Sequence, residues 1–183
     1  MTIPNFDFKS NYEVAQKRAI AMVDNDLYSR FGLSKDLRVD KALLGCIGEL
    51  AFEQILIRKS FLYTVDRVNY KIRNSDEYDF LINNKKVDIK VAKKSTSNAP
   101  QDSWTYGYPV EQKPASKDFI VIGWVDFIKE VVGFYGWITG EAVSKYAAVN
   151  SNSYKGYKYL TPNHEFKWGA LNKNFKQLFE NIF

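Results

Sequence analysis

The chain has 183 residues, of which 45% are hydrophobic and 26% charged, and its formal net charge is +5. This length and composition predict one soluble globular domain with a buried core and exclude an intrinsically disordered chain. No apolar run approaches the ~20 residues of a membrane-spanning helix and the N-terminus lacks a secretory signal pattern, so a cytoplasmic protein with no membrane partner is expected.

The positive charge favours an acidic partner such as nucleic acid, although many proteins of this charge bind none. The chain has one cysteine, Cys46, and one histidine, His164. These counts exclude an internal disulfide framework, a cysteine-rich zinc site and the metal motifs that need paired histidines. Cys46 lies in an apolar helical run and is predicted to be a buried core residue rather than a nucleophile.

Two helices are predicted at the start of the chain. The first covers residues 11–31 and ends at Gly32. The second covers residues 39–59, with Asp40 as its cap or as an acid of its first turn. This second helix is apolar nearly all round, which predicts that it is buried.

The rest of the chain favours strands. The predicted elements are, in chain order, one or two strands within 61–73, a hairpin over 78–92, a long polar loop over 93–117, strands over 118–127 and 130–139, a short helix capped by Thr139, an edge strand over 157–163 and a closing helix over 170–182. This order predicts an α/β fold in which a central mixed β-sheet is flanked by α-helices. No linker or repeat divides the chain.

The hairpin over 78–92 places charges on one of its faces. An asparagine pair at 83–84 suits the positive φ angles of a two-residue loop, which sets Asp79 directly opposite Asp88. A four-residue loop would instead set Asp79 opposite Lys90, on the same face. The other face is apolar and carries Phe80, Ile82, Val87 and Ile89.

Two carboxylates that face each other across a sheet repel. Such a pair persists either in open water or with a cation between its members. Lys90 is one such cation, and a divalent metal is a better one, since carboxylate oxygens suit Mg²⁺ or Mn²⁺. The alternative, a solvated hairpin face with no further role, stays open at this point.

Glu49 is the only charged residue in the apolar window 43–52 of the second helix. Gly45 and Gly48 each cost the helix about 1 kcal/mol relative to alanine, which indicates close packing of another element near Glu49. Alternatively, Glu49 and Glu53 share a narrow stripe that faces solvent.

These acids and Lys90, in this order, resemble the PD-(D/E)XK nucleases, the restriction-endonuclease-like superfamily. The resemblance covers residues 40–140, and the strand over 118–127 resembles the next core strand of that fold. Two departures are Tyr78 in place of the motif proline and Asp88 in place of the commoner glutamate. The resemblance implies one nuclease domain over 1–183, with a restriction-endonuclease-like core on which the first and last helices pack.

The resemblance also implies a metal-dependent DNA endonuclease that hydrolyses phosphodiester bonds. Asp79 and Asp88 would bind Mg²⁺, or Mn²⁺ in its place, with the backbone carbonyl of Ile89 as a further ligand. Lys90 would orient the attacking water and stabilise developing charge, and Glu49 would hold the metal directly or through water. Related proteins include restriction and repair enzymes, junction resolvases and proteins of phages and mobile elements.

Candidate DNA contacts follow from composition. Lysines suit the phosphate backbone, and aromatic side chains can stack on unpaired bases or equally fill the core. These candidates are Lys85, Lys86, Lys93, Lys94, Trp104, Tyr106, Tyr108, Lys155 and Lys158. Gln112 and Lys113 are expected to approach the site from the long loop, and Glu77 is a lesser candidate that would pair with Lys90.

Two other functions compete with a nuclease. The first is a nucleic-acid-binding protein, or a subunit of a larger nuclease, with the same fold and a reduced site. The second is an unrelated α/β binding protein, which predicts that Asp79 and Asp88 are exposed and that Glu49 lies far from both. A homodimer would match the two strands of a duplex. The kind of DNA, whether single-stranded, double-stranded or branched, is left open.

Overall fold

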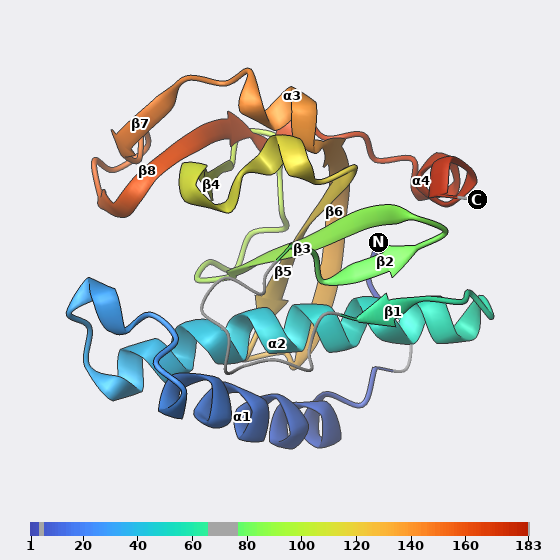
Figure 1. The fold of residues 1–183 in the computed structure, drawn as a ribbon, viewed down its shortest axis with the longest axis horizontal. Coiled ribbons are helices and arrows are strands. Elements are labelled where there is room, and N and C mark those ends of the chain that lie inside the picture. Colours follow the sequence, from blue (N-terminus) through green and yellow to red (C-terminus); the bar gives the residue numbers. More distant parts are fainter. Residues whose placement is uncertain (4–5, 66–76, 183) are drawn as a thin grey trace.

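The computed structural model describes residues 1–3, 6–65 and 77–182 (Figure 1). The larger part of the strand region predicted over 61–73 lies outside these residues. The helices are α1 (Phe8–Asp24), α2 (Lys35–Arg58), α3 (Gly140–Ser144) and α4 (Phe175–Ile182). Within the described residues, no helix is both long enough and apolar enough to span a membrane.

A five-stranded mixed sheet forms the centre of the fold. Its strands are β1 (Thr64–Val65), β2 (Phe80–Ile82), β3 (Lys85–Lys93), β5 (Phe119–Asp126) and β6 (Val131–Thr139), in the order β1-β2-β3-β5-β6. Strands β3 and β5 run parallel, and the other neighbours are antiparallel. Helix α2 lies across this sheet with α1 beside it (Figure 1). The predicted α/β fold with a helix-flanked mixed sheet is therefore confirmed.

A second sheet was not predicted. It consists of β4 (Thr105–Pro109), β8 (Lys158–Lys167) and β7 (Ala148–Ser151), in the order β4-β8-β7. Strand β4 and two 3₁₀ turns (Val110–Gln112 and Pro114–Ser116) occupy the region predicted as a loop. The polar and turn-forming residues around β4 hide the short alternation of its two tyrosines, so composition alone favours a loop.

Strand β8 was predicted as an edge strand, but it is the central strand of the second sheet. This strand contains Pro162, which has no N–H to donate to a neighbouring strand. In the structure β4 pairs with residues 163–167 only, and β7 pairs irregularly around Pro162. The missing N–H therefore falls where the ladder is already interrupted.

Two buried clusters hold the layers together. Helices α1, α2 and α4 pack on one face of the central sheet, where Phe52 lies against Phe80 and Phe179. The second sheet covers the other face of β5 through Tyr108, Phe166 and Trp168. Alternate side chains of β5 enter the two clusters, which explains why this strand is continuously apolar.

Several helices begin or end at residues other than those predicted. Helix α1 ends at Asp24, and a 3₁₀ turn over Ser29–Phe31 follows before the left-handed Gly32. Helix α2 begins earlier than predicted, because Ser34 and not Asp40 is its N-cap. The closing helix begins at Phe175 instead of residue 170. Thr139 caps α3 as predicted, with its hydroxyl accepting from the Ala142 N–H at 3.2 Å.

Candidate active site

The hairpin has the predicted register. Asn83 and Asn84 have φ angles of 48° and 63°, and Ile82 pairs with Lys85 across this two-residue turn. The four apolar side chains of the other face are all buried: Phe80, Ile82, Val87 and Ile89. This local geometry brings Asp79, just before β2, beside Asp88 in the middle of β3.

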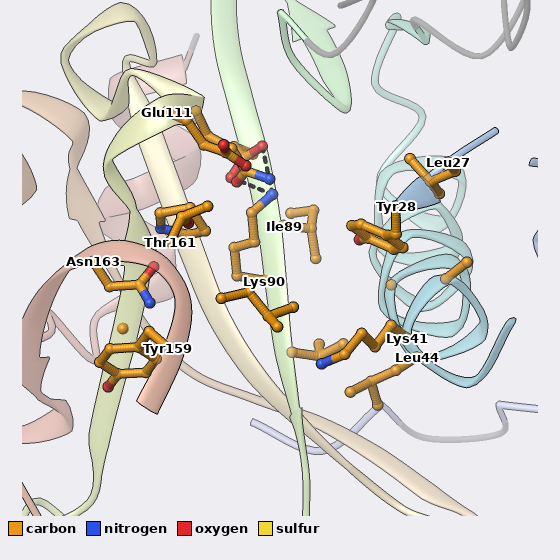
Figure 2. A pocket seen from close by; sticks show the side chains of 18 of the residues that line it. Leu27, Tyr28, Lys41, Leu44, Ile89, Lys90, Glu111, Tyr159, Thr161 and Asn163 are labelled. Atoms are coloured by element: carbon orange, nitrogen blue, oxygen red, sulfur yellow. Dashed lines mark hydrogen bonds and ion pairs between the residues drawn. The ribbon is translucent and has the colours of Figure 1, made fainter. Parts of the chain in front are cut away.

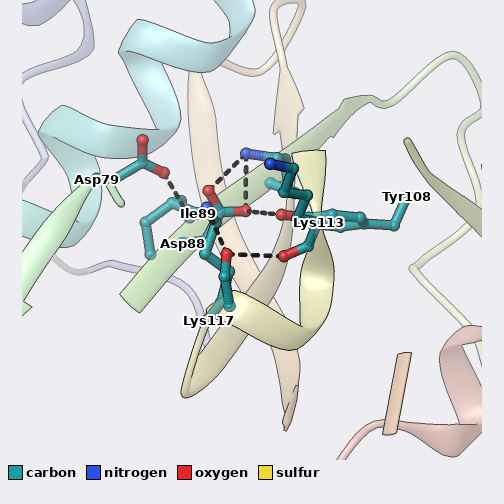
Figure 3. A network of polar contacts seen from close by, with 8 residues as sticks. Asp79, Asp88, Ile89, Tyr108, Lys113 and Lys117 are labelled. Atoms are coloured by element: carbon teal, nitrogen blue, oxygen red, sulfur yellow. Dashed lines mark hydrogen bonds and ion pairs between the residues drawn. The ribbon is translucent and has the colours of Figure 1, made fainter. Parts of the chain in front are cut away.

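Asp88 is held from two sides (Figure 3). The Lys90 ammonium lies 2.9 Å from Asp88 Oδ1 and 2.7 Å from Oδ2, and the Tyr108 hydroxyl donates to Oδ2 at 3.1 Å. Asp88 is only 4% exposed. The prediction of a solvated hairpin face is therefore wrong for Asp88, and the hairpin acids are not the exposed ones that an unrelated binding protein would carry.

The charged groups of this cluster shift one another's pKa values. Burial alone would lower the pKa of Lys90, but the Asp88 and Asp79 carboxylates hold that pKa well above its usual value. Lys90 is therefore a permanent cation at neutral pH. Burial, and then the Asp88 carboxylate, raises the pKa of the Tyr108 hydroxyl, so Tyr108 remains a proton donor to Asp88.

Asp79 is in the less favourable position. Its carboxylate accepts a hydrogen bond from the Ile89 N–H at 2.6 Å, just where β2 stops pairing with β3. Burial raises the pKa of Asp79 well above its usual value, and the negative charges of Asp88 and Glu49 raise it further. A half-buried acid near two other acids is a site of surplus negative charge.

Glu49 reaches this cluster from α2. The helix can approach β3 because Gly48 has no side chain: a Cβ there would lie 2.7 Å from a Val91 methyl group. The close packing predicted from the two glycines is thus found at Gly48, whereas Gly45 has open space beside it. Glu49, Asp79, Asp88 and Lys90 all line one cavity of about 390 Å³.

This cavity lies between the helical layer and the second sheet. Figure 2 shows Leu27, Tyr28 and Lys41 on the helical wall, with Lys90 between that wall and Tyr159 and Asn163 of β8. The structure therefore brings the four predicted catalytic side chains together in one cavity with walls from both layers. They come from α2, from the residue directly before β2, and from β3.

The predicted aromatic contacts lie in different surroundings. Tyr108 is fully buried, so its ring has no face for a base and it positions Asp88 instead. Trp104 packs edge-on against Trp168, with ring centroids 5.1 Å apart. Tyr106 lines the cavity. Of these three residues, only Tyr106 lines the cavity.

Several predicted lysines are engaged by acids. Lys94 forms an ion pair with Asp126 at 2.9 Å and its side chain is 5% exposed, so it is unavailable to a phosphate backbone. Lys86 pairs at 2.9 Å with Glu77, which corrects the predicted pairing of Glu77 with Lys90. Further contacts are Lys85 to Asp118 at 3.4 Å and Lys93 over the Phe127 ring at 5.5 Å. Lys155 and Lys158 are exposed.

Lys117 is a site residue that the sequence did not reveal. It is 5% exposed, lines the cavity and donates to Ser116 Oγ at 3.3 Å (Figure 3). Burial lowers the pKa of Lys117, and the Asp88 carboxylate opposes that shift. The sequence feature that could have indicated Lys117 is its position just before β5, the strand that runs parallel to β3.

Gln112 also lines the cavity, as predicted, and its Oε1 is buried without a hydrogen-bond partner among the described residues. The neighbouring Lys113 is exposed and does not line the cavity; its left-handed backbone, with a φ of 49°, turns the chain between the two 3₁₀ segments.

The donor atoms suit a hard divalent cation. Four carboxylates line the cavity, those of Glu49, Asp79, Asp88 and Glu111, and the charges of Glu49 and Asp88 act on Asp79. Among the described residues, however, no three acidic, histidine or cysteine side chains form a ready-made metal cluster. Lys90 contacts both oxygens of Asp88, so a cation at this position would share Asp88 with the Lys90 ammonium.

No family model, curated protein or solved structure matches this chain. The function is therefore argued from the site itself: the acid pair of the hairpin, the helix acid Glu49, and Lys90 and Lys117 line one cavity.

Proposed function

We propose that this protein is a metal-dependent DNA endonuclease with a restriction-endonuclease-like core. One observation carries the proposal. Glu49 of α2, Asp79 before β2, and Asp88 and Lys90 of β3 line the same cavity although up to 41 residues separate them in the sequence. A structural ion pair between Asp88 and Lys90 needs neither of the other two acids.

The order of the elements supports the same reading. Helix α2 precedes the β2–β3 hairpin, and β5 runs beside and parallel to β3. This order agrees with the helix, acidic hairpin and following strand that the PD-(D/E)XK resemblance implies. The residues of 118–127 that resemble the next core strand of that fold form β5.

The side chains divide the chemistry between them. Glu49, Asp79, Asp88 and the Ile89 carbonyl would hold Mg²⁺ or Mn²⁺, which when bound neutralises phosphate charge and acidifies water. Lys90 presents a fixed positive charge to the phosphate and to the water that attacks it. Tyr108 holds Asp88 in place, and Lys117 adds a second positive charge to the cavity wall.

A second function is favoured by one observation. Because Lys90 contacts both oxygens of Asp88 and no metal cluster is ready-made in the described residues, the same fold would also serve a DNA-binding protein with a reduced site. The two functions differ in DNA cleavage. A nuclease cleaves DNA and loses cleavage, but not affinity for DNA, when Lys90 is removed. A DNA-binding protein with a reduced site binds DNA and does not cleave it.

The test compares Lys90→Ala with Lys145→Ala, a control at an exposed ion pair remote from the cavity lining. Cleavage is measured on linear, circular, single-stranded and branched DNA with Mg²⁺, Mn²⁺ or EDTA, and affinity is measured in EDTA. We expect cleavage by the wild type and the control in either metal, none in EDTA, and at least a 100-fold slower rate for Lys90→Ala. Cleavage in EDTA, or equal rates for both variants, would contradict a metal-dependent site, and binding without cleavage would establish the second function.

A further inference from the structure

The turn between β7 and β8, residues 152–157, holds two aromatic side chains out in solvent. Tyr154 is 77% exposed and Tyr157 is 66% exposed. Exposed side chains of this size contribute little to a core, and two of them on one turn favour a contact with a partner. The Lys155 ammonium lies over the Tyr154 ring at 5.5 Å, so the turn combines aromatic surface with positive charge.

This turn is held by hydrogen bonds. Asn152 Oδ1 accepts from the backbone N–H groups of Tyr154 at 2.9 Å and Lys155 at 3.1 Å. The Asn152 side-chain amide donates to Glu165 at 3.0 Å, and the Ser153 N–H donates to the same carboxylate at 3.1 Å. A turn fixed in this way presents its side chains before any partner arrives, which lowers the entropy cost of binding.

The turn leads directly into the wall of the cavity. The next residues of β8, Lys158 and Tyr159, line it. The Tyr159 ring lies over Gly107 of β4, where a Cβ would come within 2.7 Å of the ring. Alternate residues of β8 share one face, so Tyr159, Thr161 and Asn163 form a continuous strip along the cavity (Figure 2).

The end of this strip carries a polar atom without a partner. Asn163 is 5% exposed, and its Oδ1 has no hydrogen-bond partner among the described residues. From Tyr157 to Asn163 the strand spans about 20 Å at ~3.3 Å per residue. A ligand that contacts both ends must therefore be an extended chain rather than a small molecule.

The chemistry of the strip selects one class of chain. Residues 148–160 contain two lysines and no acidic residue, and the nearby Glu165 carboxylate accepts hydrogen bonds from Asn152 and Ser153, so the turn suits a polyanion. Exposed rings stack on bases only where the bases are unpaired, because a duplex covers their faces. An amide such as that of Asn163 can hydrogen-bond to the edge of an unpaired base.

We propose that Tyr154 and Tyr157 stack on unpaired bases and that the β7–β8 turn and β8 guide a single strand into the cavity. This inference rests on the proposed function for the identity of the polyanion. It specifies the substrate as DNA with a single-stranded segment.

The test measures fluorescence anisotropy of labelled single-stranded DNA of about 16 nucleotides, and of a duplex of the same sequence, in EDTA. The full chain carries Tyr154→Ala with Tyr157→Ala, or Tyr154→Phe with Tyr157→Phe, which retain the rings. Ile128→Ala, at a side chain that is 94% exposed after β5, is the surface control.

We expect the double alanine variant to bind the single strand about 100-fold more weakly, about tenfold per ring, whereas the phenylalanine and Ile128 variants bind like the wild type. Unchanged affinity in the alanine variant, an equal loss on the duplex, or ring-dependent binding to phosphatidylserine vesicles in place of DNA would overturn the inference. Cleavage that proceeds without ring-dependent binding would refute this inference alone. Ring-dependent binding without cleavage in Mg²⁺ would refute the nuclease alone.

Discussion

At the scale of single residues, the cluster around Asp88 is costly as a structural element. Asp79 is half-buried near two other acids, which raises its pKa, and a protein selected only for stability has no reason to retain it. Residues that violate the rules of stability without local compensation commonly mark functional sites. The acid pair of the hairpin fits that description better than the Asp88–Lys90 pair, whose charges balance.

Asp79→Asn should therefore stabilise the protein in EDTA near pH 8. The amide oxygen keeps the hydrogen bond from the Ile89 N–H while the repelling charge is lost. Because the pKa of Asp79 is raised in the folded state, its ionisation lowers stability as the pH rises through that pKa. The melting temperature of the variant should exceed that of the wild type by several degrees, at ~2–4 °C per kcal/mol for a chain of this size.

The same pair of proteins supplies the control. As the pH falls, Asp79 becomes protonated in the folded wild type, so the difference in melting temperature should shrink. Added Mg²⁺ should raise the melting temperature of the wild type more than that of the variant, since a ligand stabilises the state that binds it. A variant that is less stable than the wild type at pH 8 would show that the Asp79 charge is stabilising.

At this scale the sequence predicted contacts within one segment, the hairpin. The even-length turn at 83–84 fixes which residues share a face, and that is enough to bring Asp79, Asp88 and Lys90 together. The contact of Tyr108 with Asp88 and the burial of Lys117 depend on how the second sheet packs on the first. The residue spacing within one segment does not determine contacts between two sheets, so the sequence alone did not predict them.

At the scale of elements, the distance between α2 and β3 sets the position of Glu49. Gly48 faces Val91, whose branched side chain is stiff, whereas Gly45 faces open space in the cavity wall. The two glycines lie on the same helix, close in the sequence, and differ only in what they face. They form a matched pair for testing whether close packing positions the site.

Gly45→Ala should raise stability by up to about 1 kcal/mol, the gain in helix propensity. Gly48→Ala gains the same propensity but pushes a methyl group into Val91, and overpacking of this kind costs about 1–3 kcal/mol. We expect the melting temperature of Gly48→Ala to fall. We also expect slower cleavage, because the added methyl group pushes α2 from β3 and moves Glu49 away from Asp79 and Asp88. The melting temperatures of both variants test this expectation. An equal increase in melting temperature for both would show that α2 is not packed tightly on β3.

Elements with strong and long patterns were predictable, and short ones were not. Strands β5 and β6 and helix α2 follow from continuous apolar runs, because burial on both sides leaves no polar positions. Strand β4 has five residues, among them a glycine and a proline, and its partner β8 lies more than fifty residues away. A pairing over that distance is decided by tertiary packing, which a local pattern does not contain.

At the scale of the whole molecule, the cavity is where two layers meet. The helices and the central sheet supply the acids and Lys90, and the second sheet supplies Tyr108, the β8 wall and the exposed turn (Figure 1). One layer thus carries the proposed chemistry and the other the proposed substrate path. Tyr106, Lys155 and Lys158 of this path were among the predicted DNA contacts, whereas the sheet that carries them was not predicted.

Cleavage of closed circular DNA by the wild type and by Asp88→Asn, each in Mg²⁺ and in EDTA, tests whether the Asp88 site hydrolyses DNA with a metal. A single cut relaxes the circle, so the first hydrolytic event is scored. Glu141→Gln, at an exposed acid of α3, is the matched control. We expect cleavage by the wild type and the control in Mg²⁺ only, and none by Asp88→Asn although it remains folded. Intact circles with the wild type in Mg²⁺, or equal cleavage by Asp88→Asn, would contradict this expectation.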